Sequence, residues 1–278
     1  MTQQEAYSDL VQSLKPEDIL KTFPDVAPIT TTNLDPRPTS KESADDKQLF
    51  DGQDAEQIRL MEEVCIVVDW NDTPVGAGSK KTCHLMTNIN RGLLHRAFSV
   101  FLFDENNRLL LQKRADEKIT FANMWTNTCC SHPLAIPSEL GSSSLDEISD
   151  LTFSMPGAKN AARRKLEHEL GIPVDAIPLE KYKFLTRIHY ASPSTGPWGE
   201  HEVDYIFIVK ANVPLDININ EIGDSRYVSV TELKEMFKDE SLVFTPWFKL
   251  ICENYLFKWW DDLDNVEQYQ DDKITHLL

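Results

Sequence analysis

Short runs of apolar residues alternate with polar segments along most of the chain, which is typical of strands interrupted by helices. Six runs rich in β-branched and aromatic residues predict strands, at residues 65–69, 96–103, 108–114, 182–190, 202–210 and 226–230. The polar residues 104–107 predict a hairpin turn between the second and third of these runs. Strands with interspersed helices predict a mixed α/β or α+β domain.

Helical periodicity is clearest in the second half of the chain. Residues 158–170 have a helical apolar pattern, and Gly171 is placed to end that helix. Residues 247–263 have a second such pattern and include two adjacent tryptophans. Thr231 is a candidate N-cap for a shorter helix over residues 232–238.

Two segments lack a continuous period. Residues 137–157 are rich in Ser, Gly and Pro, and we expect them to form a surface insertion. Residues 1–56 are expected to be a weakly ordered acidic arm, with a short helix over 9–23 interrupted near Pro16. The arm then contains four prolines that oppose regular structure, Pro24, Pro28, Pro36 and Pro38. Residues 57–278 are expected to form a single catalytic domain that ends in a helix.

Charge is unevenly distributed over the 278 residues, of which 41% are hydrophobic, enough for a sizeable core. The formal charge is −17, and residues 1–60 and 253–278 together contribute −11 of it. This balance argues against a nucleic-acid-binding protein. Residues 79–118, by contrast, hold eight basic and four acidic side chains. The local excess suits a small anionic ligand, although a solvated surface would explain it equally well.

The chain contains no apolar run of the roughly 18–20 residues that a membrane helix requires, and its start does not resemble a secretory signal. The five cysteines are an odd number, and the adjacent pair Cys129 and Cys130 is strained as a disulfide. We therefore expect reduced thiols and a cytoplasmic location.

Three histidines and two glutamates form a candidate metal site: His84, His95, His132, Glu200 and Glu202. Strand alternation would place both glutamates on one face and His201 on the other. Two carboxylates on one face repel each other unless a cation lies between them or one is protonated. Imidazole nitrogens with carboxylate oxygens suit Mn²⁺, Zn²⁺ or Fe²⁺ better than Mg²⁺. The alternative is a solvent-facing edge strand with ordinary histidines.

Cys130 is a candidate reactive cysteine because His132 follows it by two residues. A nearby metal and basic side chains would lower its pKa and leave it partly as thiolate. The alternative is an inert buried thiol.

Four sequence motifs carry a family resemblance. They read Gly-Leu-Leu-His-Arg-Ala-Phe-Ser-Val at 92–100, Trp-Thr-Asn-Thr-Cys-Cys-Ser-His-Pro at 125–133, Trp-Gly-Glu-His-Glu-Val-Asp-Tyr at 198–205 and Phe-Thr-Pro-Trp-Phe-Lys at 244–249. They are similar to motifs of the type I isopentenyl-diphosphate isomerases, and the resemblance runs from about Ile58 to the C-terminus. It implies the Nudix fold, a mixed β-sheet between helices.

The resemblance also implies a reaction, the metal-assisted 1,3-allylic proton shift between isopentenyl and dimethylallyl diphosphate in isoprenoid and sterol biosynthesis. Glu202, assisted by Tyr190, would donate a proton and Cys130 would accept one, while Trp247 would stabilise a carbocation. The small-molecule diphosphate would contact Lys80, Arg114, Lys118 and Ser131.

Two metals are implied as well. His84, His95, His132, Glu200 and Glu202 match the ligands of a divalent metal, which is Mn²⁺, Zn²⁺ or Mg²⁺. Glu169 matches a position linked to a second, diphosphate-bound Mg²⁺.

Two other functions fit parts of the sequence. Nudix hydrolases carry a glutamate-rich helix motif, and the matching stretch here is Arg-Lys-Leu-Glu-His-Glu-Leu-Gly-Ile at 164–172. Lys165 and His168 replace two of its three glutamates and leave only Glu169, which argues against a hydrolase. A non-enzymatic metal-binding protein would not need Cys130 and the complete His and Glu set together.

Overall fold

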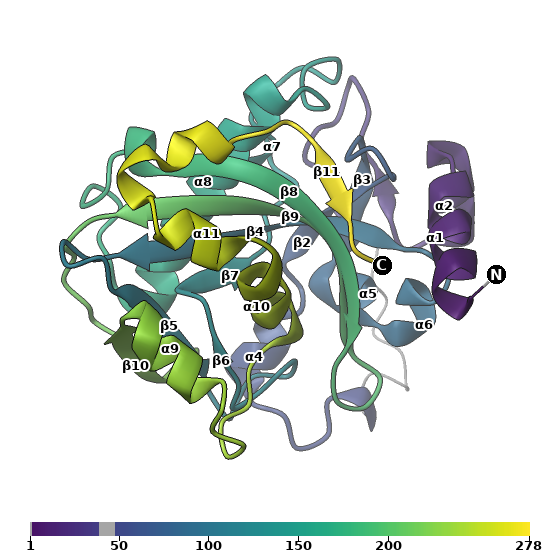
Figure 1. Cartoon of the computed structure of the whole chain (residues 1–278). Helices are drawn as coiled ribbons and strands as arrows, with labels where there is room; N and C mark the ends of the chain where they lie inside the picture. Colours follow the sequence, from purple (N-terminus) through teal and green to yellow (C-terminus); the bar gives the residue numbers. More distant parts are fainter. Residues whose placement is uncertain (1, 39–47) are drawn as a thin grey trace.

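The computed structural model describes residues 2–38 and 48–278, and its centre is one mixed sheet (Figure 1). Seven strands follow one another across it in the order β1, β3, β2, β4, β9, β8, β11. Their bounds are β1 Ala27–Pro28, β2 Val64–Val68, β3 Pro74–Ser79, β4 Leu94–Phe103, β8 Lys183–Pro193, β9 Gly199–Lys210 and β11 Ile274–His276. β4 and β9 are parallel, as are β8 and β11, and the other neighbours are antiparallel.

Four more strands branch from this path: β5 Leu109–Arg114, β6 Trp125–Thr126, β7 Cys129–Ser131 and β10 Ile222–Val228. The predicted hairpin exists, but β4 and β5 pair only at Phe103 and Leu109, next to the turn. Beyond that pair the strands diverge, because β5 pairs with β6 and β10 whereas β4 pairs with β7 and β9. The pocket described below is lined by residues of β5, β7 and β9, among others.

Helices cover both faces of the sheet, as the resemblance predicted (Figure 1). Helix α8, Leu151–Leu170, packs Ala158, Ala162 and Leu166 against one face. The other face is covered by α9 Val230–Met236, α10 Pro246–Ile251 and α11 Phe257–Trp260. The side chains of β9 alternate between these two layers. Val203 and Phe207 lie toward α8, whereas Ile206 and Ile208 lie toward α10. The shorter helices are α4 Ala55–Leu60, α5 Lys80–His84, α6 Met86–Ile89 and α7 Pro137–Leu140.

The predicted insertion at 137–157 is wrong in part, because α8 begins at Leu151 rather than at residue 158. Asp150 caps it by accepting a hydrogen bond from the Thr152 N–H, and Gly171 ends it with a φ of 64° as expected. Pro156 is the sixth residue of this helix and donates no N–H hydrogen bond to it. The next residue, Gly157, lies so close to α7 that an added Cβ would be 2.3 Å from the Glu139 carbonyl oxygen.

The C-terminal helix and its neighbour also differ from the sequence prediction. A single helix was expected over residues 247–263, but α10 continues through a π-helical turn at Cys252–Leu256 into α11, and a 3₁₀ segment follows at Leu263–Tyr269. The N-cap of α9 is Ser229, not Thr231, because the Ser229 hydroxyl accepts from the Glu232 N–H and Glu232 reciprocates.

The N-terminal segment is more ordered than expected in its described part. α1 Gln3–Ser13 and α2 Pro16–Thr22 confirm the interruption near Pro16, although α1 begins six residues before the predicted start at residue 9, and β1 adds to the edge of β3. Val11, Ile19 and Phe23 are buried, because they pack on the sheet and its flanking residues. Residues 39–47 of the predicted arm lie outside the described residues, and the division of the chain at residue 56 stays a prediction.

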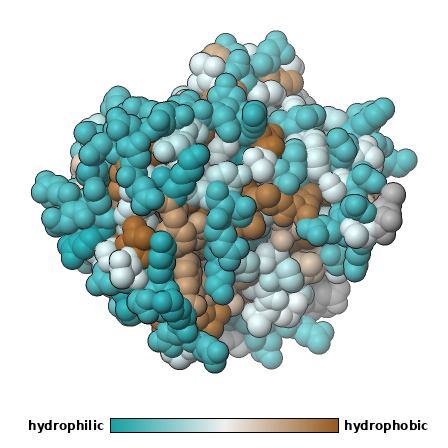
Figure 2. Space-filling model, viewed as in Figure 1, coloured by the Kyte–Doolittle hydropathy of each residue, from teal (hydrophilic) through white to brown (hydrophobic). Residues whose placement is uncertain are grey.

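The surface carries few large apolar side chains. Figure 2 shows one face covered mainly by hydrophilic residues, with short hydrophobic bands between them. Within the described residues, the exposed large hydrophobic side chains are Leu10, Leu215, Ile219 and Val243. Over residues 2–38 and 48–278, no helix combines the length and apolar character needed to cross a membrane.

Candidate active site

Strand β9 presents two carboxylates on one face, as its alternation predicted. Glu200 and Glu202 line a pocket, whereas His201 points to the opposite face and is fully buried. The neighbouring β8 places Tyr190 directly opposite Glu202. The Tyr190 hydroxyl donates to Glu202 Oε2 over 2.5 Å, so one carboxylate oxygen has a fixed orientation.

Three histidines from separate elements converge on these carboxylates. His84 is the last residue of α5, His95 lies on β4 opposite Glu202 in register, and His132 follows β7. Their rings lie 4.7–4.8 Å apart between centroids. One potential ligand atom from each of the five residues lies within 4.8 Å of all the others.

The donor atoms fit a shared divalent cation. His84 Nδ1 donates to the Lys80 carbonyl over 2.6 Å, which leaves Nε2 with a free lone pair. His84 Nε2 and Glu200 Oε2 are 2.7 Å apart, yet both are buried and neither makes a hydrogen bond of proper geometry. His95 Nε2 is also buried without a hydrogen-bond partner. Buried lone pairs that converge in this way are what a metal requires of its ligands.

Burial sets the protonation of this cluster. It lowers the pKa of His84 to about 3 and lowers the pKa of His95 and His132 as well, so the three imidazoles are neutral and able to coordinate. Burial raises the pKa of Glu200, and the nearby Glu202 charge raises it further. A bound cation would relieve that repulsion, so the predicted ligand set and the geometry agree.

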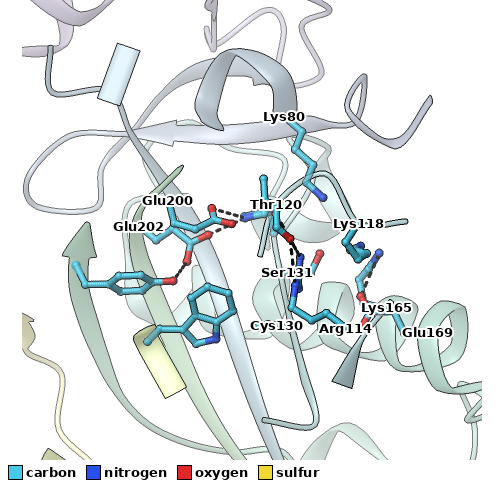
Figure 3. Close-up of a pocket in the computed structure, with 13 residues that line it drawn as sticks. Lys80, Arg114, Lys118, Thr120, Cys130, Ser131, Lys165, Glu169, Glu200 and Glu202 are labelled. Carbon is cyan, nitrogen blue, oxygen red and sulfur yellow. Dashed lines mark hydrogen bonds and ion pairs between the residues drawn. The ribbon is translucent and has the colours of Figure 1, made fainter. Parts of the chain in front are cut away.

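The pocket is small, and Figure 3 shows its residues pointing inward from opposite sides. Glu200 and Glu202 lie at one side, and the basic side chains of Lys80, Arg114 and Lys118 lie at the other. Every residue that the sequence predicted for catalysis, substrate or metal lines this pocket except His84 and His95, which lie behind it within the cluster.

The basic end of the pocket is held by buried partners. Arg114 Nη2 donates to the Thr120 carbonyl over 2.9 Å and its Nε donates to the Phe121 carbonyl over 3.1 Å. Lys118 Nζ lies 2.6 Å from Glu221 Oε2, and both side chains are almost completely buried. Three cationic side chains at one end of a small pocket, two of them held by buried partners, suit a ligand with more than one negative charge.

Glu169 and Trp247 complete the pocket. Glu169 comes from α8 and lies outside the five-residue cluster, with Oε1 3.3 Å from Lys165 Nζ and Oε2 accepting from Gln112. The Trp247 indole packs against Tyr190 with 6.3 Å between centroids. Its Nε1 donates to Asn127 Oδ1 over 3.2 Å, so the ring is held in place.

The two adjacent cysteines have different environments. Cys130 lines the pocket, whereas Cys129 is fully buried on the other side of β7, with its thiol 3.6 Å from Glu169 Oε2. The predicted lowering of the Cys130 pKa is wrong, because burial raises it to about 12 and Arg114 offsets only part of that effect. Cys130 is therefore a thiol here. All five cysteines are unbridged, as expected.

Sequence reasoning missed two residues that line the pocket, Lys165 and Thr120, and one that pairs with a lining residue, Glu221. Lys165 was considered as the replacement of a motif glutamate, not as a pocket residue, but it is buried and lines the pocket beside Glu169. Thr120 lines the pocket and orients Arg114. Glu221 pairs with Lys118 and accepts from Gln57 Nε2 over 2.8 Å. Only Lys165 had a signal in the sequence, its place in the degraded helix motif.

Comparisons with known proteins agree with this geometry. The NUDIX domain model matches residues 156–248. The chain is 60% identical to isopentenyl-diphosphate delta-isomerase of Candida albicans, over 98% of this chain and 99% of that protein. It is 62% identical to the protein of the same name from Schizosaccharomyces pombe, over 80% of this chain and 93% of that protein. It is 50% identical to isopentenyl-diphosphate Delta-isomerase 1 of Bos taurus, over 82% of this chain and 97% of that protein.

Proposed function

The chain belongs to the isopentenyl-diphosphate delta-isomerase family, the enzymes that interconvert isopentenyl and dimethylallyl diphosphate, and we propose that it does so with Cys130 and Glu202 as its proton-transfer pair. The observation that carries the proposal is that both side chains line one small pocket whose other end is cationic. Five unbridged thiols support a reducing compartment such as the cytoplasm.

The reaction moves one double bond and two protons. One group adds a proton to the terminal alkene carbon and the other removes a proton from the allylic carbon, so the substrate keeps its composition. The donor must begin protonated and the acceptor ionised, and the two roles exchange in the reverse direction. The assignment of Glu202 as donor and Cys130 as acceptor stays a prediction, and it requires a change of both protonation states on binding of substrate and cation. Burial raises the Cys130 pKa and favours the thiol, whereas, against the effect of burial, hydrogen bonds with His132 and His95 lower the Glu202 pKa and favour the carboxylate. The Tyr190 hydroxyl, which donates to Glu202, is placed to replace a proton that Glu202 gives up.

Proton addition creates a tertiary cation that must be protected from water. Trp247 is 3% exposed and its ring is fixed by Asn127, so its indole face is a suitable neighbour for that cation. A desolvated cation–π contact is worth on the order of 2 kcal/mol. Tyr190 and Trp247 together form the apolar wall of the pocket.

The diphosphate is proposed to bind at the basic end, where Lys80, Arg114 and Lys118 lie with Ser131. Lys165 lies at the same end of the pocket. Its ammonium is 3.3 Å from Glu169 Oε1 and 4.0 Å from Glu221 Oε2, the oxygen that pairs with Lys118. In this arrangement the bound diphosphate fixes the position of the alkene, and neither phosphate is cleaved.

Two divalent metals are proposed. The cluster of His84, His95, His132, Glu200 and Glu202 would hold one of Mn²⁺, Zn²⁺ or Mg²⁺, and Glu169 would meet a Mg²⁺ that arrives with the diphosphate. A cation in the cluster would fix the Glu202 carboxylate and make its acid form more acidic.

Substitution of the pair tests the proposal. Cys130→Ala and Glu202→Gln should each lower kcat by at least about 1000-fold with little change in melting temperature, since removing a proton-transfer group typically costs 10²–10⁴-fold. Cys129→Ala is the matched control, because its thiol does not line the pocket, and the loss of its 3.6 Å contact with Glu169 Oε2 should cost no more than a few-fold. Near-wild-type turnover in Cys130→Ala or Glu202→Gln, or equal losses at the two cysteines, would refute the assignment.

A further inference from the structure

A row of three histidines lies on the far face of the sheet, directly behind the candidate metal site. His201 comes from β9, His189 from β8 and His276 from β11. His189 Nε2 is 2.9 Å from His201 Nε2, and His189 Nδ1 is 2.7 Å from His276 Nδ1. His189 and His201 are completely buried. None of these rings faces the pocket, and the proposed reaction uses none of them.

One assignment of hydrogens satisfies the whole row. His201 Nδ1 is 2.8 Å from the Leu93 carbonyl, which can only accept, so this nitrogen carries the hydrogen. His201 Nε2 is then an acceptor, and His189 Nε2 must donate to it. His189 Nδ1 in turn accepts from His276 Nδ1. Every ring is neutral and every hydrogen bond has one donor, so the row is a directional chain that holds each ring in one orientation.

Both ends of the polypeptide close this row. At one end, Tyr7 of α1 donates its hydroxyl hydrogen to the Ile89 carbonyl over 2.7 Å, and its oxygen is 3.2 Å from His201 Nδ1. At the other end, the Trp70 ring stacks on His276 with 3.8 Å between centroids and an interplanar angle of 8°. The Leu277 N–H also donates to the His189 carbonyl over 2.8 Å.

Each buried histidine is adjacent in sequence to residues of the site. His201 lies between Glu200 and Glu202, and His189 precedes Tyr190, which hydrogen-bonds Glu202. Successive side chains of a strand point to opposite faces from one backbone. A ring that is fixed on the far face therefore fixes the backbone from which the neighbouring carboxylates project. Metal ligands must be held to within about 0.5 Å for tight binding.

We propose that Tyr7, His189, His201 and His276 are positioning residues for the metal centre, so that the first helix and the last strand both hold the ligands in place. The inference rests on the proposed function only in assuming that the five-residue cluster binds a metal. It does not require the isomerase chemistry, and its test measures metal retention rather than turnover.

The experiment follows the release of Mn²⁺ from the full-length protein. Protein loaded with Mn²⁺ is freed of excess ion and mixed with excess EDTA, and the rate of loss is followed by electron paramagnetic resonance. His201→Ala should release Mn²⁺ at least about tenfold faster, because loss of a group that orients metal ligands typically costs 10–100-fold in metal affinity. His201→Asn should recover most of this loss, because its amide can donate to the Leu93 carbonyl in place of Nδ1. Tyr7→Phe should accelerate release a few-fold.

Two control variants separate positioning from general loss of stability. Leu233→Ala empties a fully buried position on α9, far along the chain from the row, and Tyr182→Phe removes another buried tyrosine hydroxyl. Both should release Mn²⁺ within twofold of the wild-type rate, even though Leu233→Ala melts at a lower temperature.

Three results would overturn the proposal. Release from His201→Ala no faster than from Leu233→Ala at equal loss of melting temperature would show that the row is structural only. If His201→Ala does not fold, the Tyr7→Phe variant decides. A rate of Mn²⁺ release equal to that of the wild type would show that Tyr7 does not position the metal ligands. Wild-type protein that retains none of Mn²⁺, Zn²⁺ or Mg²⁺ after removal of excess ion would refute the metal centre itself, whereas isomerase activity would be judged separately by turnover.

Discussion

Lys118, a proposed substrate-binding residue, shows how burial adjusts the pKa of a pocket side chain. Burial lowers its pKa to about 8, and the attraction of Glu221 offsets only part of that effect. Below pH 8 the ammonium is charged and can bind the diphosphate, and above that pH it becomes neutral. We therefore expect the KM for isopentenyl diphosphate to rise about tenfold or more as pH increases past 8, since a charged hydrogen bond contributes about 1.5–3 kcal/mol.

The measurement is the pH profile of kcat/KM for the wild type and for Lys118→Arg. A guanidinium stays charged throughout the range, so the decline above pH 8 should disappear in the variant. An identical decline in both proteins would assign it to another group.

At the scale of single residues, the sequence predicted which side chains lie together in the site but did not predict their pKa shifts. The alternation of β9 placed Glu200 and Glu202 on one face, and the structure confirms that arrangement. The pKa of Cys130 was predicted in the wrong direction, because it depends on burial by segments that are distant in sequence. Glu221 was missed for the same reason, since it is 103 residues from the lysine that it pairs with.

Among the elements, α8 carries part of the basic end of the pocket and depends on one close approach to α7. A Cβ added at Gly157 would lie 2.3 Å from the Glu139 carbonyl oxygen and 2.7 Å from the Gly141 nitrogen. These are backbone atoms that cannot turn aside as a flexible side chain would. Gly157→Ala should therefore destabilise the protein by about 1–3 kcal/mol.

Urea unfolding measures this change, and Glu167→Ala on the exposed side of the same helix is the control, expected within about 0.5 kcal/mol of wild type. Because Lys165 and Glu169 project from α8, a shift of the helix should also raise the KM for the diphosphate. Wild-type stability in Gly157→Ala would contradict the close packing of α7 on α8.

Element boundaries were predicted where local signals are strong and missed where tertiary packing decides. Gly171 ended α8 as expected because a left-handed residue is needed there. The start of the same helix was missed because the Pro and Gly residues within 151–157 imply a loop, although packing on α7 keeps them helical. The pairing of β4 with β9 was not predictable, because parallel neighbours are joined by a long crossover.

At the scale of the whole molecule, the sheet brings residues from distant segments to one end of the diverging strands. The resemblance predicted the mixed sheet between helices, and both the architecture and the similarity to known isomerases confirm it. The N-terminal segment was expected to be separate from the site. Tyr7 of its first helix instead contacts the His201 ring, which lies behind Glu200 and Glu202. No local pattern in residues 1–56 predicts this contact.

The most direct test of the whole account is nuclear magnetic resonance of the purified protein with isopentenyl diphosphate, Mg²⁺ and Mn²⁺ or Zn²⁺ in D₂O. We expect new dimethylallyl methyl signals, deuterium entering the product from solvent, and unchanged phosphorus signals of the intact diphosphate. Phosphate release with an unchanged alkene would contradict the account, because it would mean that the same pocket hydrolyses diphosphates.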